Sequence, residues 1–293
     1  MNDNSASDGV SRRNFLKSAG TGSALAAVLN SDSAGGLSQP ADKVAADTGA
    51  KILSDDIRAE FDEYGFVVFK EVIPRRDALR VEERVKEIMA RQPDADKVDQ
   101  HLPGLFNYLD PKDDALFVPL VTQPLCLALA ESVLGDGFQM TEVGCRWRKP
   151  GATAGPLRVT RPTDRFSRAG LPMPNVCFVL GISWMLSDLT RDMGATLYLP
   201  FSHHVPRAPR ANASYKYLVP VEAPAGSVLV HHSGVWHGFG ANTTKDKARV
   251  GVMSGYIPSW MDPVAVGWQP LKRSIRDRLP ERVRQMNTHV TEA

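Results

Sequence analysis

The sequence predicts a mainly β protein with flanking helices (α+β), in which the helices pack on a β jelly roll. Three observations support this class. The 293 residues are 43% hydrophobic and 23% charged, which is the composition of a globular protein with one full core. Helical periodicity dominates the chain between residues 54 and 134. From residue 138 onward, short β-rich runs are separated by Gly, Pro and Asn turns, as in antiparallel sandwiches and barrels.

The composition also excludes several classes of protein. The chain carries 35 Lys and Arg against 33 Asp and Glu, a formal net charge of +2, so it has no electrostatic footprint for nucleic acid or an anionic membrane. Its three cysteines are too few and too scattered for a disulfide scaffold or a thiolate zinc site. We therefore expect ordinary buried thiols and a small molecule, rather than a nucleic acid, as the partner.

The amino terminus reads as an export signal. Residues Ser11–Lys17 (SRRNFLK) resemble the twin-arginine motif, and an apolar stretch of small residues follows from Ala19 to Leu29. That stretch has the length of a signal-peptide core and is too short to be a stable membrane span. We expect residues 1–35 to be a twin-arginine signal peptide, read by the twin-arginine export machinery, and the mature protein to be periplasmic or exported. Residues 36–50 then form a linker, and 51–293 a single jelly-roll domain.

The first helix and strand have clear boundary signals. Ser54 is a helix N-cap, and Asp55 and Asp56 after it are stabilised by the positive end of the helix dipole. Gly65 ends the helix. A short buried strand, Phe66–Phe69, follows. Further helices are predicted after Pro74, over Thr122–Leu134, and over Lys272–Met286, where Pro280 interrupts the last one. The predicted β runs are Phe138–Trp147, Val176–Leu186, Thr196–Leu199, Tyr215–Val221, Ser227–Val230 and Arg249–Ile257.

The chemistry is concentrated in the β half. A Gly turn enters the strand Gly226–Val230, Trp236-His237 follows after a loop, and Arg249 stands twelve residues beyond His237. Upstream, Asp188–Gly194 leads into Leu197–His203. Together with the early Tyr-Gly-Phe-Val-Val segment, this order and spacing resemble the phytanoyl-CoA dioxygenase family of Fe(II)- and 2-oxoglutarate-dependent oxygenases. The resemblance extends over residues 54–260.

The resemblance implies a fold, a reaction class and site residues. The fold is a double-stranded β-helix, a cupin-like jelly roll that holds Fe(II) at one mouth on two histidines and one carboxylate. His237 would be the distal iron ligand. Arg249 would clamp the remote carboxylate of 2-oxoglutarate, a role that suits the planar, permanently charged guanidinium. The implied reaction is hydroxylation of a small organic or acyl substrate.

The chain departs from the family pattern at the first iron ligands. The family places a His-x-Asp motif shortly after a Pro-Gly turn, and the corresponding residues here are Arg158 and Thr160. Arg has no lone pair for a metal and Thr offers only a neutral hydroxyl. Other residues could rebuild a site: His232, or its neighbour His231, with His237 and either Asp164 or Asp192.

Three hypotheses follow from these residues. The first is a divergent, enzymatically active Fe(II)/2-oxoglutarate-dependent dioxygenase. The second is an iron-free pseudoenzyme that binds a small carboxylate or acyl ligand, because Arg158 in the iron position would turn a metal pocket into an anion pocket. The third is a structural or protein–protein module of the cell envelope. Fold alone does not decide among them.

Overall fold

The computed structural model describes residues 53–160, 162–263 and 268–292. The predicted signal peptide and linker, including Arg12 and Arg13, lie outside these residues. The helices are α4 (Asp55–Tyr64), α5 (Arg75–Met89), α6 (Asp114–Val121), α7 (Pro124–Leu134), α8 (Thr163–Arg168), α9 (Arg273–Arg276) and α10 (Glu281–Met286), with 3-10 turns η3 (Leu105–Tyr108), η4 (Pro111–Asp113) and η5 (Ser202–His204). The strands are β1 (Phe66–Phe69), β2 (Asp99–Leu102), β3 (Gln139–Met140), β4 (Gly144–Arg148), β5 (Leu180–Met185), β6 (Thr196–Leu199), β7 (Val219–Val221), β8 (Val228–His232), β9 (Trp236–Phe239), β10 (Arg249–Ile257), β11 (Leu271–Lys272) and β12 (Val290–Thr291).

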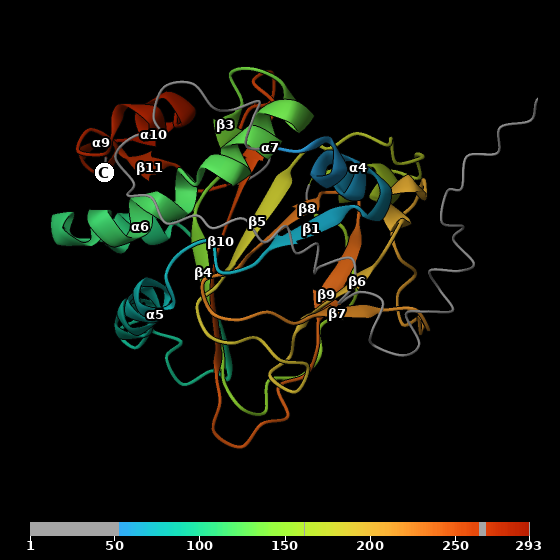
Figure 1. The fold of residues 1–293 in the computed structure, drawn as a ribbon, viewed down its shortest axis with the longest axis horizontal. Helices are drawn as coiled ribbons and strands as arrows, with labels where there is room; N and C mark the ends of the chain where they lie inside the picture. The colour runs from blue at the N-terminus through green and yellow to red at the C-terminus, as the bar shows by residue number, and fades with distance from the viewer. Residues whose placement is uncertain (1–52, 161, 264–267, 293) are drawn as a thin grey trace, which may run out of the picture.

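Two antiparallel sheets form the body of the protein. The larger has the strand order β1-β8-β5-β10-β4-β2, with β3 paired to β10, and the smaller has the order β7-β6-β9. Neighbours in the large sheet come from distant parts of the chain; for example, Phe66 of β1 pairs with His231 of β8. Figure 1 shows the small sheet on one side of the large sheet and the main helices on the other. The predicted jelly-roll class is confirmed.

The first helix and strand form as their sequence predicts. The Ser54 hydroxyl accepts a hydrogen bond from the Ile57 N–H at 3.3 Å, and Gly65 ends α4 with φ +83°. A side chain at Gly65 would overlap the His203 ring, so glycine serves both the turn and this close approach. All four residues of β1 are buried, because the strand is covered on both faces.

Helices α5, α6 and α7 cover the outer face of the large sheet (Figure 1). The apolar stripe of α5, which includes Val81, Val85 and Ile88, is buried in the main core with Ile182 of β5 and Val252 of β10. Burying each such side chain stabilises the fold by about 1.5–3 kcal/mol. The apolar residues whose spacing predicts this helix are therefore the ones that pack against the large sheet.

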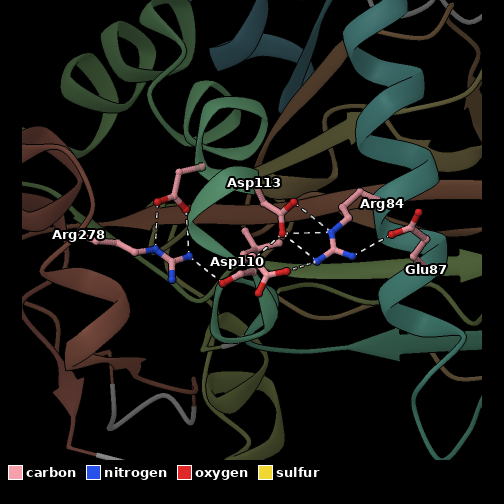
Figure 2. Close-up of polar contacts among 7 residues, drawn as sticks. Arg84, Glu87, Asp110, Asp113 and Arg278 are labelled. Carbon is pink, nitrogen blue, oxygen red and sulfur yellow. Dashed lines mark hydrogen bonds and ion pairs between the residues drawn. The ribbon is translucent and has the colours of Figure 1, made fainter.

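An ion-pair network ties α5 to the segment before α6. Arg84 contacts both carboxylate oxygens of Asp113 at 2.9–3.1 Å, and also pairs with Glu87 at 2.9 Å and Asp110 at 3.0 Å (Figure 2). The Asp113 carboxylate in turn accepts the Asp110 backbone N–H at 2.9 Å. Nearby, Arg278 makes a bidentate pair with Asp114 at 3.0 and 3.1 Å. The network joins the helical layer to the C-terminal helices.

Several element boundaries differ from the sequence prediction. The run predicted over Phe138–Trp147 divides into β3 and β4, and the closing helix divides at Pro280 into α9 and α10. Strands β2 and β9 and helix α6 were not predicted. Their sequences are short or contain turn residues, and β9 forms by pairing with β6 on one side and with Arg158 on the other.

No single helix within the described residues is long and apolar enough to cross a membrane. Only a broken pair, Pro111–Val121 with Pro124–Leu134 and a 51° bend between them, reaches that length and apolarity.

Candidate functional site

A cavity of about 540 Å³ lies between the two sheets. Its walls come from both: Gly181 and Ser183 of β5 and His231 of β8 on the large sheet, and Tyr198 of β6 and His237 of β9 on the small sheet. The segment with Arg158, Thr160 and Asp164 closes a further side. The topology thus brings together residues as far apart in the chain as His101 and Trp268.

His237 is buried in the cavity wall and held in one orientation. Its Nδ1 lies 3.0 Å from the Val235 carbonyl oxygen, so Nδ1–H donates and Nε2 carries the free lone pair. Its ring stacks on Tyr198 at a centroid distance of 5.7 Å. Burial, followed by the charge of Arg158, lowers the pKa of His237 to about 4, so the imidazole is neutral at pH 7. A neutral imidazole with a free Nε2 can accept a hydrogen bond or bind a metal.

Arg158 lies directly opposite His237 across an antiparallel bridge. The two residues exchange backbone hydrogen bonds of 2.8 and 3.0 Å, so their side chains leave the sheet on the same face. The Arg158 side chain is exposed within the cavity, and its guanidinium makes no ion pair or hydrogen bond with any described residue. Thr160, two residues on, also lines the cavity. The position where the resemblance expects an iron-binding histidine is therefore occupied by an uncompensated cation.

His231, not His232, faces His237. Successive residues of β8 point to opposite sides, and the His231 and His237 ring centroids are 4.9 Å apart. His232 points to the other side of the sheet, where its ring lies 5.0 Å from that of His203 and its Nδ1 accepts the Gly234 N–H at 2.9 Å. The combination of His232 with His237 is therefore not formed, because strand alternation separates them.

The acidic residues considered as ligands lie apart from the two histidines. Asp164 of α8 lines the cavity, but one of its oxygens pairs with Arg168 at 2.6 Å, and the other is buried without a described hydrogen-bond partner. Asp192 is exposed in a turn and hydrogen-bonded to Thr190; it does not line the cavity.

Arg249 is set behind the cavity wall, in a small adjoining recess. Its Nη1 donates to the Gly194 carbonyl at 2.7 Å, and its Nη2 donates to the Thr196 hydroxyl at 2.7 Å. Thr196 and Ser183 line both the recess and the cavity. Burial, with the nearby charge of Arg148, lowers the pKa of Arg249 to about 9. Arg249 therefore lines the recess and not the cavity, and Thr196, which accepts its Nη2–H, lines both.

A cluster of four arginines surrounds the Phe239 ring. Their guanidinium carbons lie 4.7–5.0 Å from the ring centroid; they belong to Arg146, Arg148, Arg158 and Arg249. Asp99 pairs with two of them, Arg146 and Arg148, at 2.6–3.2 Å. The cluster therefore carries excess positive charge, which favours an anionic ligand. Sequence reasoning missed Phe239 and Tyr198, since nothing in their local sequence indicates that they face a cavity.

The described residues do not fit the family's iron site. No group of three or more His, Cys, Asp or Glu among them could hold a metal ion. Three histidines line the cavity, His101, His231 and His237, and the Arg158 charge beside His237 opposes binding of a dication.

Comparisons with known proteins identify the family of this chain. The family model "Phytanoyl-CoA dioxygenase (PhyH)" matches residues 61–251. "Dioxygenase af480" of Aspergillus fumigatus is 26% identical over 245 residues, covering 79% of this chain and 76% of that protein. Two uncharacterized mycobacterial proteins, from Mycobacterium bovis and Mycobacterium tuberculosis, are each 38% identical over only 72 residues, 24% of this chain and 26% of theirs.

Solved structures share the fold at low identity. HygX from Streptomyces hygroscopicus, crystallised with nickel and 2-oxoglutarate, superposes with a TM-score of 0.59 at 18% identity, covering 75% of this chain and 91% of that one. The epimerase SnoN, in complex with Fe3+, alpha ketoglutarate and nogalamycin RO, gives 0.52 at 18% identity, covering 68% and 81%. On the family match, which extends over most of the described chain, this dioxygenase-like protein belongs to the phytanoyl-CoA dioxygenase family.

Proposed function

We propose that the protein binds 2-oxoglutarate, or a closely related small dicarboxylate, in its jelly-roll cavity, with Arg249 holding one carboxylate. The observation that carries this proposal is the state of Arg249. Its guanidinium is desolvated, has a lowered pKa and forms no ion pair with a described carboxylate. A bound carboxylate beside Thr196 would compensate that charge in bidentate fashion.

The family supports an enzyme of the dioxygenase class. The activity that we propose on this basis is hydroxylation of a small organic or acyl substrate, with 2-oxoglutarate as co-substrate. We propose that the protein itself orients the dicarboxylate between Arg249 and the cavity wall that contains His231 and His237.

Calorimetric titration of the purified protein with 2-oxoglutarate tests the binding proposal. Arg249→Met should weaken binding at least tenfold, about 1.4 kcal/mol, because it removes a charge-assisted pair. Arg76→Met, a change at an exposed arginine of α5, is the matched control and should leave the affinity unchanged. Equal affinity of the Arg249→Met protein and the unaltered protein would refute the assigned clamp. Succinate formation with added Fe(II) and O2 reports separately on dioxygenase activity.

The second candidate is an iron-free pseudoenzyme that binds a small carboxylate or acyl ligand. The specific observation in its favour is Arg158 opposite His237, with its guanidinium exposed to the cavity. Metal analysis of the purified protein, with and without added Fe(II), separates the two candidates. Stoichiometric Fe(II) that tightens 2-oxoglutarate binding favours the enzyme, whereas binding indifferent to Fe(II) favours the pseudoenzyme.

We also propose that the protein is exported by the twin-arginine route. The support is the Ser11–Lys17 motif and the apolar stretch after it. Replacing both Arg12 and Arg13 by Lys should abolish delivery to the periplasm, because the exporter reads the guanidinium pair. Unchanged fractionation of the double variant would refute the proposal.

A further inference from the structure

We propose that the preferred ligand of this cavity is a 2-hydroxy acid rather than a 2-oxo acid: its carboxylate meets Arg158 and its adjacent hydroxyl donates to Nε2 of His237. With the remote carboxylate on Arg249, the ligand is a 2-hydroxydicarboxylate. This last element rests on the proposed function, whereas the hydroxyl preference depends only on Arg158 and His237.

Nε2 of His237 is a hydrogen-bond acceptor in the cavity wall, because the other ring nitrogen, Nδ1, carries the proton. Because Nδ1–H of His237 donates to the Val235 carbonyl, Nε2 has a lone pair and no proton. The ring is buried, and stacking on Tyr198 restricts its rotation. Nε2 has no hydrogen-bond partner among the described residues, so a ligand that fills the cavity must donate to it or leave it unpaired. An unpaired buried polar atom costs about 1–3 kcal/mol.

The Arg158 guanidinium, beside Nε2 of His237, favours a carboxylate next to the ligand's hydroxyl. Arg158 and His237 are partners in an antiparallel bridge, so the guanidinium and the imidazole extend from neighbouring segments on one face. Arg158 is in contact with the Phe239 ring but has no carboxylate partner among the described residues. Its fork of N–H donors suits a carboxylate. A donor and an acceptor side by side therefore require a ligand with an anionic acceptor next to a hydroxyl donor.

The same pair discriminates against related ligands. A keto oxygen has only lone pairs, which the Nε2 lone pair repels. An ammonium group could donate to Nε2, but the Arg158 charge repels it. An unsubstituted carbon leaves Nε2 unpaired. Two acids also line the cavity: one Asp164 oxygen pairs with Arg168 while the other has no described partner, and Glu142 accepts the Gln269 N–H at 2.9 Å. Variants at His237 therefore separate its contribution from theirs.

Titrations of metal-free protein, treated with a chelator, test the preference without any mutation. We expect 2-hydroxyglutarate to bind at least about tenfold more tightly than 2-oxoglutarate, glutarate or glutamate. The monocarboxylates 2-hydroxybutyrate and 2-oxobutyrate should show the same preference at lower affinity. Binding of 2-oxoglutarate as tight as that of 2-hydroxyglutarate would overturn the inference.

Variants locate the preference in the two residues. His237→Phe keeps a ring and removes the acceptor, so it should abolish the preference for the hydroxy acids over the oxo acids and glutarate. His237→Gln restores an acceptor oxygen and should recover part of the preference. Arg158→Met should weaken all the acids, and a preference that survives His237→Phe would contradict the assignment.

The two proposals fail in different ways. Arg249→Met should lower the affinity for the five-carbon diacids and leave the affinity for the butyrates unchanged. If the variant bound the diacids as tightly as the parent protein does, only the dicarboxylate clamp at Arg249 would be refuted. Equal binding of 2-hydroxybutyrate and 2-oxobutyrate counts against the hydroxyl preference alone.

Discussion

Arg158 and His237 face each other across an antiparallel bridge, with reciprocal backbone hydrogen bonds of 2.8 and 3.0 Å. This register places a permanent cation next to His237, whose tautomer is set by the Val235 carbonyl. Arg158 stands where the resemblance predicts an iron-binding histidine. Because an arginine takes the place of the expected histidine, the cavity suits an oxyanion better than a dication.

Restoring the missing ligands should create a metal site. Arg158→His with Thr160→Asp supplies a second imidazole and an anionic oxygen on the face that His237 shares, and removes the repelling charge. The affinity for Fe(II), or for Mn(II) as an air-stable substitute, should rise more than about tenfold, a small part of the 10–16 kcal/mol of complete structural zinc sites. Isothermal titration measures it.

The gain should require His237. Adding His237→Ala to the double variant should remove the increase, since the third ligand is lost. Tight stoichiometric metal binding by the unaltered protein would be the contrary result and would point to a site rebuilt around His231.

Gly181 leaves the space for the His231 ring. A Cβ at this position of β5 would overlap the imidazole atoms, although the backbone conformation tolerates any residue. Gly181→Ala should displace the ring and destabilise the protein by about 1–3 kcal/mol, measured by urea denaturation. Gly155→Ala is the control, because its Cβ would meet only ordinary contacts of 3.8 Å or more; a change beyond about 0.5 kcal/mol there would argue against the steric explanation.

Stability should fall as the pH drops below 6.5. Burial lowers the pKa of His203 to about 4 and that of His232 to about 3, whereas an unfolded histidine titrates near 6.5. Between pH 6.5 and about 4 the unfolded chain therefore binds protons that the native protein does not. Each group then costs up to about 1.4 kcal/mol of stability per pH unit.

Denaturation of His203→Gln/His232→Gln at pH 7.5, 6 and 5 checks this origin. The double variant should show a shallower loss of stability than the unaltered protein. Glu60 opposes the trend, because burial raises its pKa to about 7 and the native state gains a proton below that value. An identical pH slope in the variant and the parent protein would exclude the two histidines as the source.

The Arg84 network should contribute more than an exposed ion pair. The Asp113 carboxylate is only 6% exposed, so Arg84→Ala would leave a buried charge without its main partner (Figure 2). The expected loss is about 3 kcal/mol. Arg76→Ala, whose side chain is 81% exposed, should cost less than about 0.5 kcal/mol. Similar losses in both variants would show that the network adds nothing beyond a surface pair.

Local chemistry was sufficient to predict the elements with strong boundary signals. Ser54, Gly65 and the apolar spacing of α5 act within one or two turns of chain, so the helices at 55–64 and 75–89 follow from the sequence. The strand beginning at Arg249 was predicted to its final residue, Ile257, because Val250, Val252, Tyr256 and Ile257 favour a strand. The absence of a His-x-Asp motif is likewise visible in the sequence, because it is a matter of residue type.

Tertiary structure decided which of these residues meet. His231 and His232 are adjacent and chemically identical, and only the pairing of β8 with β1 and β5 determines which one faces the cavity. A shift of one residue in that register would exchange them. The same long-range pairing gathers four arginines on Phe239 and places Arg249 behind Thr196. Residue type is local information, whereas the face and neighbours of a side chain depend on hydrogen-bond register between segments far apart in the chain.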